Sequence, residues 1–235
     1  MKKIIFILVV IVTFLTILTG CDSKQKENQE NKKRDNEAAL LFKSEYESLN
    51  GKTNKSGKEH RSVTIPKDNP YEKVSSSKIV EMINNKETFY VYFGDKLCPW
   101  CRSVVEKSCE VAKNNKIEKI YYVNIWDDEG NEVLRDKYEL ENGTPVKVLE
   151  GTGTYYKLLE VFDKVLSDYT LTDDDGNEIE VGEKRIYAPN FVYVEKGKAI
   201  KLVEGISDKQ KDPREELTEA MLKDEEKQFN DLFSK

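Results

Sequence analysis

Two cysteines three residues apart, Cys98 and Cys101, stand between a strand-like run and a helix-like run. The run before them, residues 88–93 (TFYVYF), consists of β-branched and aromatic residues, which favour a buried strand. The run after them has apolar residues at helical spacing between positions 104 and 112. The pair is therefore predicted to lie at the first turn of a helix that directly follows a buried strand.

This position gives the two thiols different chemistry. The free N–H groups and the positive dipole end of a helix N-terminus favour a thiolate at Cys98. Only a thiolate attacks a disulfide, so Cys98 is the predicted nucleophile and Cys101 the resolving thiol. Pro99 is tolerated in a first helical turn because its missing N–H has no partner there. Trp100 is expected to shield the pair, and the motif as a whole predicts thiol–disulfide exchange.

Other interpretations of the cysteines remain open. A Cys-x-x-Cys pair is also half of a zinc site, and two neighbouring cysteines also form purely structural disulfides. The chain has no second such pair, and its single histidine, His60, is far away in sequence. We therefore expect no metal and no cofactor, and no Ser–His–Asp triad. Cys109, on the apolar stripe of the same helix, is interpreted as a buried inert thiol.

The N-terminus is predicted to be a targeting segment. Residues 1–3 carry two lysines, residues 4–18 are apolar, and Leu18-Thr19-Gly20-Cys21 follows. This layout is typical of a secretory signal, and its end resembles the bacterial lipobox. The resemblance implies a signal peptide over 1–20, lipidation of Cys21, and anchoring on the extracytoplasmic face of the cell membrane. The alternatives are an ordinary signal peptide, or a membrane anchor with a chance cysteine.

The charge pattern separates a tether from a folded domain. Residues 22–36 contain no apolar side chain, so we expect a flexible tether over 21–58, with a weakly amphipathic helical pattern at 38–49 and a loop at 51–58. The folded domain is expected over 59–235, beginning with a short edge strand at 61–65. The net charge of −6 gives no basic footprint for nucleic acid.

The domain itself is predicted to be α/β. Serines at 75–77 begin a helix, and residues 117–125 form a second strand. After Ala188-Pro189, a hairpin is predicted from strands at 191–194 and 199–203, followed by a helix from about Pro213.

About sixty residues, 126–186, are inserted between these halves. We expect helices at 132–140 and 155–166 and a hairpin of 169–171 with 178–181 around an Asp-Gly turn. The aspartate run at the turn does not fit a calcium loop and is interpreted as solvated. The insert is expected to pack on the domain and shape the groove beside Cys98.

Together, residues 75–125 and 186–235 resemble a thioredoxin fold with an insert before the proline strand. The resemblance rests on Cys98-Pro99-Trp100-Cys101, the Ala188-Pro189 step and the hairpin that ends near Gly205. It implies a cis Pro189 facing the active site, and substrate contacts at Pro99, Trp100, Ala188 and Pro189. The sequence around the cysteine pair, YFGDKLCPWCR, is similar to the corresponding segment of thioredoxin-like lipoproteins and bacteriocin-accessory proteins of Gram-positive bacteria.

Two residues depart from the thioredoxin pattern. Leu97 stands where these proteins usually have tryptophan, and Tyr92 stands where they bury an acidic residue. Asp95 or a water would then have to move the proton of the resolving thiol.

The expected function is disulfide exchange in secreted or surface proteins by a membrane-anchored oxidoreductase. Its partners would be protein thiol or disulfide substrates and a further redox partner that recharges it. The alternatives are a dedicated bacteriocin-maturation factor, or a redox-silent binding lipoprotein with a structural disulfide.

Overall fold

The structure, a computed structural model, describes residue 30 and residues 32–234. The chain divides into two compact units, Met1–Ala38 and Ala39–Lys235. The expected signal peptide and Cys21 lie outside the described residues. Within the described part of the chain, no helix has both the length and the apolar character needed to cross a membrane.

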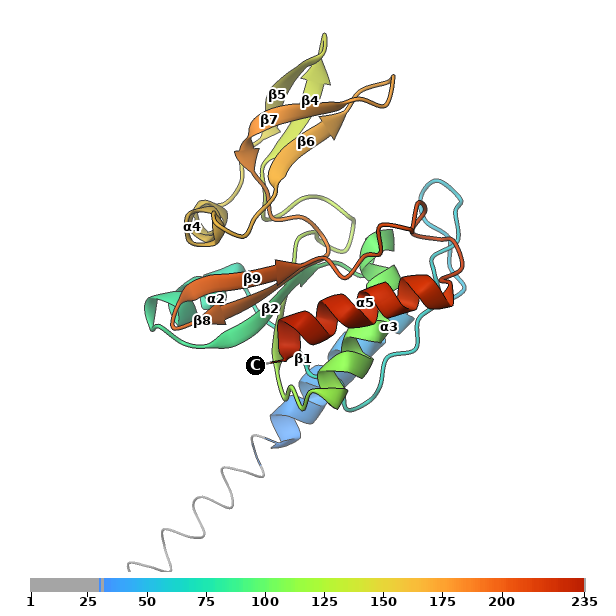
Figure 1. Cartoon of the computed structure of the whole chain (residues 1–235), viewed down its shortest axis with the longest axis vertical. Helices are drawn as coiled ribbons and strands as arrows, with labels where there is room; N and C mark the ends of the chain where they lie inside the picture. Colours follow the sequence, from blue (N-terminus) through green and yellow to red (C-terminus); the bar gives the residue numbers. More distant parts are fainter. Residues whose placement is uncertain (1–29, 31, 235) are drawn as a thin grey trace, which may run out of the picture. The chain divides into compact units, whose positions relative to one another are not determined.

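A mixed five-stranded sheet forms the centre of the second unit (Figure 1). Its strand order is β1-β3-β2-β8-β9; β1 and β2 both run parallel to β3, whereas β8 is antiparallel to β2 and to β9. The parallel strands are joined by helices and the last two by a hairpin turn, so the predicted α/β class is confirmed. The strands are β1 (Tyr71–Lys73), β2 (Phe89–Gly94), β3 (Ile120–Asn124), β8 (Asn190–Glu195) and β9 (Lys198–Val203).

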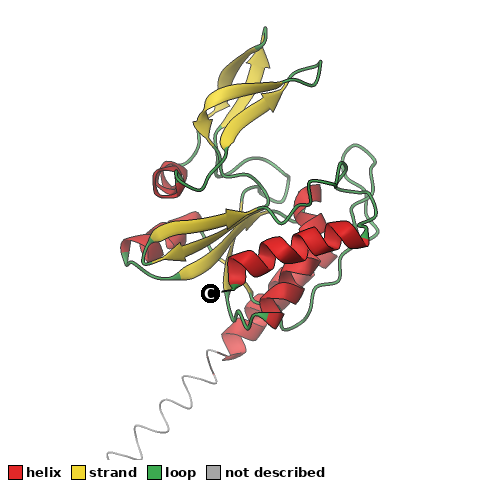
Figure 2. Cartoon of the chain, in the orientation of Figure 1, coloured by secondary structure: helices red, strands yellow, loops and turns green. Residues whose placement is uncertain are grey.

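Helices cover both faces of this sheet (Figure 2). Buried residues of α3 (Pro99–Asn114) and α5 (Glu219–Phe233) belong to one apolar cluster, and those of α2 (Ser76–Asn84) and α4 (Gly153–Phe162) to another. Helix α2 begins as predicted, because the Ser75 side chain accepts the N–H of Lys78. Helix α5 begins later than predicted, at the cap provided by Thr218.

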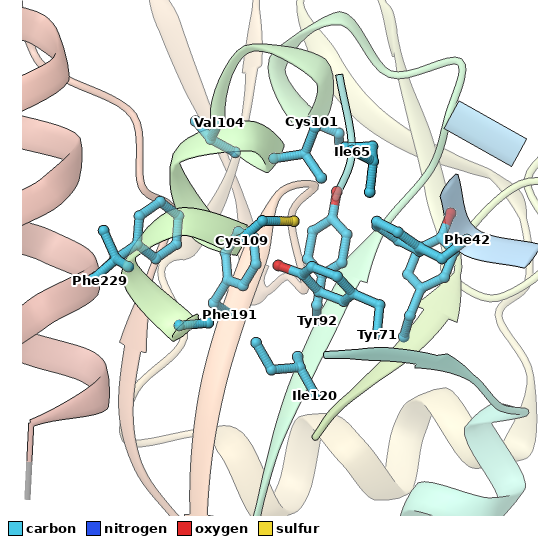
Figure 3. Close-up of a cluster of buried hydrophobic side chains, with 14 of the residues drawn as sticks. Phe42, Ile65, Tyr71, Tyr92, Cys101, Val104, Cys109, Ile120, Phe191 and Phe229 are labelled. Atoms are coloured by element: carbon cyan, nitrogen blue, oxygen red, sulfur yellow. The ribbon is translucent and has the colours of Figure 1, made fainter. Parts of the chain in front are cut away.

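The cluster beneath α3 is built largely from stacked aromatic rings (Figure 3). The ring of Tyr92 on β2 lies between Phe191, at a centroid distance of 4.3 Å, and Tyr122, at 5.3 Å. Tyr92 has no exposed surface, and Cys101 packs in the same cluster. The aromatic core therefore reaches the cysteine pair directly.

The insert between β3 and β8 forms two hairpins that flank α4. Strands β6 (Asp168–Thr172) and β7 (Glu178–Lys184) form the predicted hairpin. The helix predicted over 132–140 is wrong, because strand β4 (Lys137–Glu141) pairs there with β5 (Thr144–Leu149). Asn142 and Gly143 make the turn between them with φ of 51° and 77°, which suits a two-residue hairpin loop.

Helix α4 is part of the core, as predicted for the insert. Leu158 and Phe162 have no exposed surface, and the ring of Phe162 meets that of Phe93 on β2 edge-on at 5.9 Å. The predicted helix over 155–166 is therefore confirmed, with an end at Phe162.

The segment before residue 59 differs from the expected tether. A helix runs through residues 32–47, and its side chains Phe42 and Tyr46 are 1% and 0% exposed within the aromatic cluster. The folded unit therefore starts near Ala39, because these rings complete the core over β1 and β3.

The edge strand expected at residues 61–65 is also wrong. The side chain of Asn50 donates to Val63 O and accepts from Val63 N, at 2.8 and 3.0 Å. The N–H of Ile65 is taken by the Glu47 carboxylate at 2.8 Å. Since side chains take these backbone groups, the segment forms no strand ladder, and β1 forms the edge instead.

Arg102 ties this N-terminal segment to the helix that carries the cysteines. Its guanidinium has no exposed surface and donates to Tyr46 O at 2.8 Å, Asn50 Oδ1 at 2.9 Å and Arg61 O at 2.7 Å. A fourth bond reaches Lys96 O at 3.3 Å.

Candidate active site

The cysteine pair lies where the sequence predicts it. Cys98 is the N-cap of α3 and Pro99 occupies its first turn, directly after β2 and a short loop. The sulfur of Cys98 accepts the backbone N–H of Cys101 at 3.4 Å. The side chain at the cap is thus a thiol that satisfies a free N–H group of the helix, the role that Ser or Asp plays elsewhere.

The surroundings favour the thiolate of Cys98. A hydrogen bond with the Cys101 thiol lowers the pKa of Cys98 below its usual value, and the backbone N–H groups of Cys101 and Trp100 lower it further. The positive charge of Arg135 acts in the same direction, and together these effects outweigh burial. Cys98 is therefore the thiol prepared for attack.

Cys101 has the opposite character. It has no exposed surface, and burial raises its pKa well above the usual value, with the neighbouring Cys98 sulfur adding to the rise. The hydroxyl of Tyr92 and the backbone N–H of Asp95 hydrogen-bond to the Cys101 sulfur and oppose this rise. The second thiol is thus held protonated, with a hydroxyl beside it.

Tyr92 is the buried side chain of β2 that lies beside the resolving thiol. Its hydroxyl contacts Cys101 and shares a 2.8 Å hydrogen bond with the hydroxyl of Tyr46. The hydroxyl passes over Gly94, where any Cβ would collide with it. Glycine at position 94 is therefore a condition for the contact between Tyr92 and Cys101.

Asp95 is buried beside the pair, but its carboxyl group has a different partner. Oδ1 accepts the N–H of Leu97 at 2.8 Å, and Oδ2 is buried with no hydrogen bond from the described residues. Burial raises the pKa of Asp95 to about 7. The group that Asp95 extends to Cys101 is its backbone N–H, so the hydroxyl of Tyr92 is the side-chain group that lowers the pKa of the resolving thiol.

Ala188 and Pro189 lie directly against the nucleophile. The peptide bond between them is cis, as the resemblance implies. The thiol of Cys98 donates to Ala188 O at 3.4 Å. Asn190 braces this loop, because it accepts the N–H of Tyr187 at 2.7 Å and donates to Pro189 O at 3.0 Å.

A cavity of about 360 Å³ opens beside this loop. It collects residues from the cysteine helix, the insert, the Pro189 loop and the segment after β9. Three of the four predicted substrate contacts, Trp100, Ala188 and Pro189, line it, whereas Pro99 does not. The complete lining is Trp100, Thr170, Tyr187, Ala188, Pro189, Glu204 and Ile206.

The insert reaches the site through residues that the sequence analysis did not identify. Thr170 on β6 lines the cavity, and its N–H donates to the hydroxyl of Tyr187 at 3.0 Å. Arg135 donates to Ile186 O at 3.1 Å and forms an ion pair with Glu132, and both side chains are buried. No local sequence signal marks their place at the site, because the partners that hold them there, Tyr187 and Ile186, lie 17 and 51 positions away.

Cys109 takes no part in the pair. It is buried on α3, and burial raises its pKa well above the usual thiol value. Its predicted role as an inert packed thiol agrees with this environment.

In comparisons with known proteins, no family model and no curated protein matches the sequence.

Proposed function

We propose that residues 39–235 form a thioredoxin fold with an insert between β3 and β8. The sheet order, with a helix between β1 and β2 and another between β2 and β3, supports this assignment. The hairpin of β8 and β9, followed by α5 on the face of α3, completes the same arrangement. The cysteine pair at the start of α3 and the cis Ala188-Pro189 bond occupy the positions that the resemblance implies.

We propose further that the protein is a thiol–disulfide oxidoreductase acting through Cys98 and Cys101. The observation that carries this proposal is the inequality of the two thiols. Cys98, with a lowered pKa, faces Ala188 O at the cavity, and Cys101, with a raised pKa, is sealed beneath it. A purely structural disulfide needs neither an activated sulfur nor a binding cavity beside it.

The exchange follows from this arrangement. The Cys98 thiolate attacks one sulfur of a substrate disulfide, a new S–S bond forms, and the other substrate sulfur leaves as a thiolate that takes a proton. Cys101, once deprotonated, then attacks the sulfur of Cys98. The substrate leaves reduced by two electrons, and the Cys98–Cys101 disulfide holds the oxidised state.

The same steps in reverse oxidise a substrate dithiol. The direction is set by the reduction potential of the couple against its partners. A protein partner that recharges the couple is part of this proposal, whereas a bound cofactor is not, since the two sulfurs carry the electrons themselves.

The proposed location is the extracytoplasmic face of the cell membrane, with Cys21 as the lipidated residue. Leu18-Thr19-Gly20-Cys21 supports it, together with the polar stretch of residues 22–36 that follows. An oxidising compartment agrees with a dithiol whose task is exchange with secreted proteins.

The reduction potential of the Cys98–Cys101 couple tests the proposed activity. We expect a value within the range of active oxidoreductases, about −270 to −120 mV. Redox titration against glutathione or dithiothreitol, with quenching by a mass-tagged alkylating reagent, measures it. A potential below about −300 mV would indicate a structural disulfide and refute the proposal.

A further inference from the structure

Glu204 is an acidic side chain without a partner in the cavity beside Pro189. It follows β9 directly, is half-buried, and lines the cavity together with Trp100 and Pro189. Among the described residues, no hydrogen bond or ion pair reaches its carboxylate. A carboxylate removed from water in this way gains most from a cation brought by another molecule.

The negative charge of Asp208 makes a cationic partner for the Glu204 carboxylate still more favourable. Burial raises the pKa of Glu204, and the negative charge of Asp208 raises it further, with no lysine or arginine acting in the opposite direction. The cavity is therefore acidic on one side. An anionic side chain would be repelled there, and an apolar one would leave the carboxylate desolvated without a partner.

The aromatic lining and the size of the cavity also suit a cationic side chain. Trp100 presents aromatic surface in the cavity, and aromatic faces attract ammonium and guanidinium groups. The ring of Tyr187 already has the guanidinium of Arg185 5.8 Å from its centroid, so Trp100 is the aromatic side chain that remains for a second cation. A volume of about 360 Å³ accommodates a long side chain.

The segment that carries Glu204 is held firmly in place. The side chain of Gln228 on α5 accepts the N–H of Gly205 at 3.1 Å and donates to Ile206 O at 2.7 Å. Gly205 has a φ of 76°, and a Cβ there would collide with the ring of Phe229. The carboxylate is thus presented from a fixed backbone, which lowers the entropic cost of binding.

We propose that this cavity binds a lysine or arginine side chain adjacent to the reactive cysteine of the substrate, with Glu204 as its counter-ion. The inference rests on the proposed function and specifies its substrate class. The substrate backbone would lie against Ala188, and the basic side chain would point toward Glu204 and Trp100. Selection would act before the chemical step, by holding the substrate sulfur at Cys98.

Peptide substrates test the charge preference. Each peptide carries one cysteine in a disulfide with a fluorescent thiol, and one neighbouring residue is Lys, Gln or Glu. The variable residue is placed in turn at each of two positions on either side of the cysteine. For the reduced full-length chain, we expect the Lys peptide to react about tenfold faster than the Gln peptide at one position at least, and the Glu peptide slowest.

The variant Glu204→Gln should react with the three peptides at similar rates, because it keeps the shape of the side chain and removes its charge. The matched control is Glu226→Gln, an exposed residue on α5 outside the cavity, which should keep the preference. Circular dichroism and a denaturation curve verify that both variants are folded.

The outcomes separate this inference from the proposed function. Exchange at Cys98 at rates independent of peptide charge, or a preference unchanged in Glu204→Gln, would refute the basic subsite and leave the oxidoreductase proposal standing. Failure of every peptide, together with an unreactive Cys98, would refute both.

Discussion

The sulfur of Cys98 lies 3.4 Å from the carbonyl oxygen of Ala188, although the two residues are 90 positions apart in the chain. This contact joins the start of α3 to the loop before β8. It places the nucleophile against Ala188, which is one of the residues that line the cavity. Binding and attack are therefore located at the same point of the surface.

The first prediction concerns the two thiols. In the variant Cys101→Ser, alkylation of Cys98 should show a pH midpoint below the ordinary thiol value of about 8.5, because serine retains a hydrogen-bond donor. In Cys101→Ala this donor is absent, and the midpoint should rise, since the hydrogen bond from residue 101 is the largest effect that lowers the pKa of Cys98. Iodoacetamide kinetics against pH, with the labelled site assigned by mass spectrometry, give both values.

The variant Cys98→Ser provides the converse measurement. Cys101 should react slowly near neutral pH, because its pKa is raised by burial. Faster labelling of Cys101 than of Cys98 would reverse the assigned roles. Cys109 should stay unlabelled in the folded protein.

The second prediction concerns the hydroxyl beside the resolving thiol. Tyr92→Phe removes the group that lowers the pKa of Cys101, so mixed disulfides at Cys98 should persist longer while alkylation of Cys98 is unchanged. The control is Tyr46→Phe, which breaks the same hydroxyl pair but leaves Tyr92 in contact with Cys101.

Both of these variants should lose about 0.5–1.5 kcal/mol of unfolding free energy, since each breaks the buried hydrogen bond between the two hydroxyls. Only Tyr92→Phe should slow resolution, measured by quenched-flow and mass spectrometry of the mixed disulfide. Equal resolution rates in the two variants would show that the Tyr92 hydroxyl has no role in the second step.

The third prediction concerns pH and stability. Glu225 on α5 has no exposed surface, and neither carboxylate oxygen has a hydrogen bond from the described residues. Burial raises its pKa to about 8, against the opposing charges of Lys107 and Arg61 and with the support of Glu106. In the unfolded chain a glutamate titrates near pH 4.3, at about its model-peptide value.

Between these two values the folded protein holds a proton that the unfolded chain has lost. The contribution of Glu225 to the unfolding free energy is therefore fully present below about pH 4 and is lost as the pH rises to about 8. We expect roughly 2–4 kcal/mol less unfolding free energy at pH 8 than at pH 5 from this residue. Urea denaturation of Glu225→Gln should show a flatter pH profile, and the neighbouring exposed variant Glu226→Gln should match the wild type.

The fourth prediction tests whether the insert belongs to the core. Leu158→Ala on α4 should reduce the unfolding free energy by about 2–5 kcal/mol, because the side chain is fully buried. The matched control is Val148→Ala on β5, which is 44% exposed and should change stability by less than about 0.5 kcal/mol. A Leu158→Ala protein as stable as the control would make the insert an appended module.

The fifth prediction concerns the membrane anchor. Cys21→Ala should abolish incorporation of a fatty-acid analogue in cells and release the protein from the membrane fraction, because the modified thiol is removed. Equal labelling of wild type and variant would refute lipidation at Cys21. Cys109→Ser serves as the control, since a buried thiol offers no site for acylation.

The parts of the fold that were predictable are those coded by local sequence. Strand β2 is a continuous run of aromatic and β-branched residues, and the start of α3 is marked by a cap and a proline. Strand β4 was missed, because residues 132–140 contain many good helix formers. The Asn142-Gly143 pair was the available signal, since this dipeptide favours a two-residue hairpin turn.

The parts that were not predictable depend on distant partners. Residues 61–65 alternate like a strand, yet Asn50 and Glu47 take their backbone groups. At the site, the cysteine pair was identified from its motif, and Ala188-Pro189 from the resemblance. Glu204 was missed because a single acidic residue after a strand looks like any solvated charge until its cavity is seen.

Arg102 has a consequence for how the protein unfolds. Its guanidinium is satisfied by Tyr46 O, Asn50 Oδ1 and Arg61 O, all contributed by the segment that precedes the sheet. Detaching that segment would leave the buried cation with only its 3.3 Å bond to Lys96 O out of the four described, so the segment and α3 should open together as one cooperative unit. In native-state hydrogen exchange, amides near Tyr46 and those of α3 should then share one opening free energy, and proteases should trim the chain back only to about residue 39.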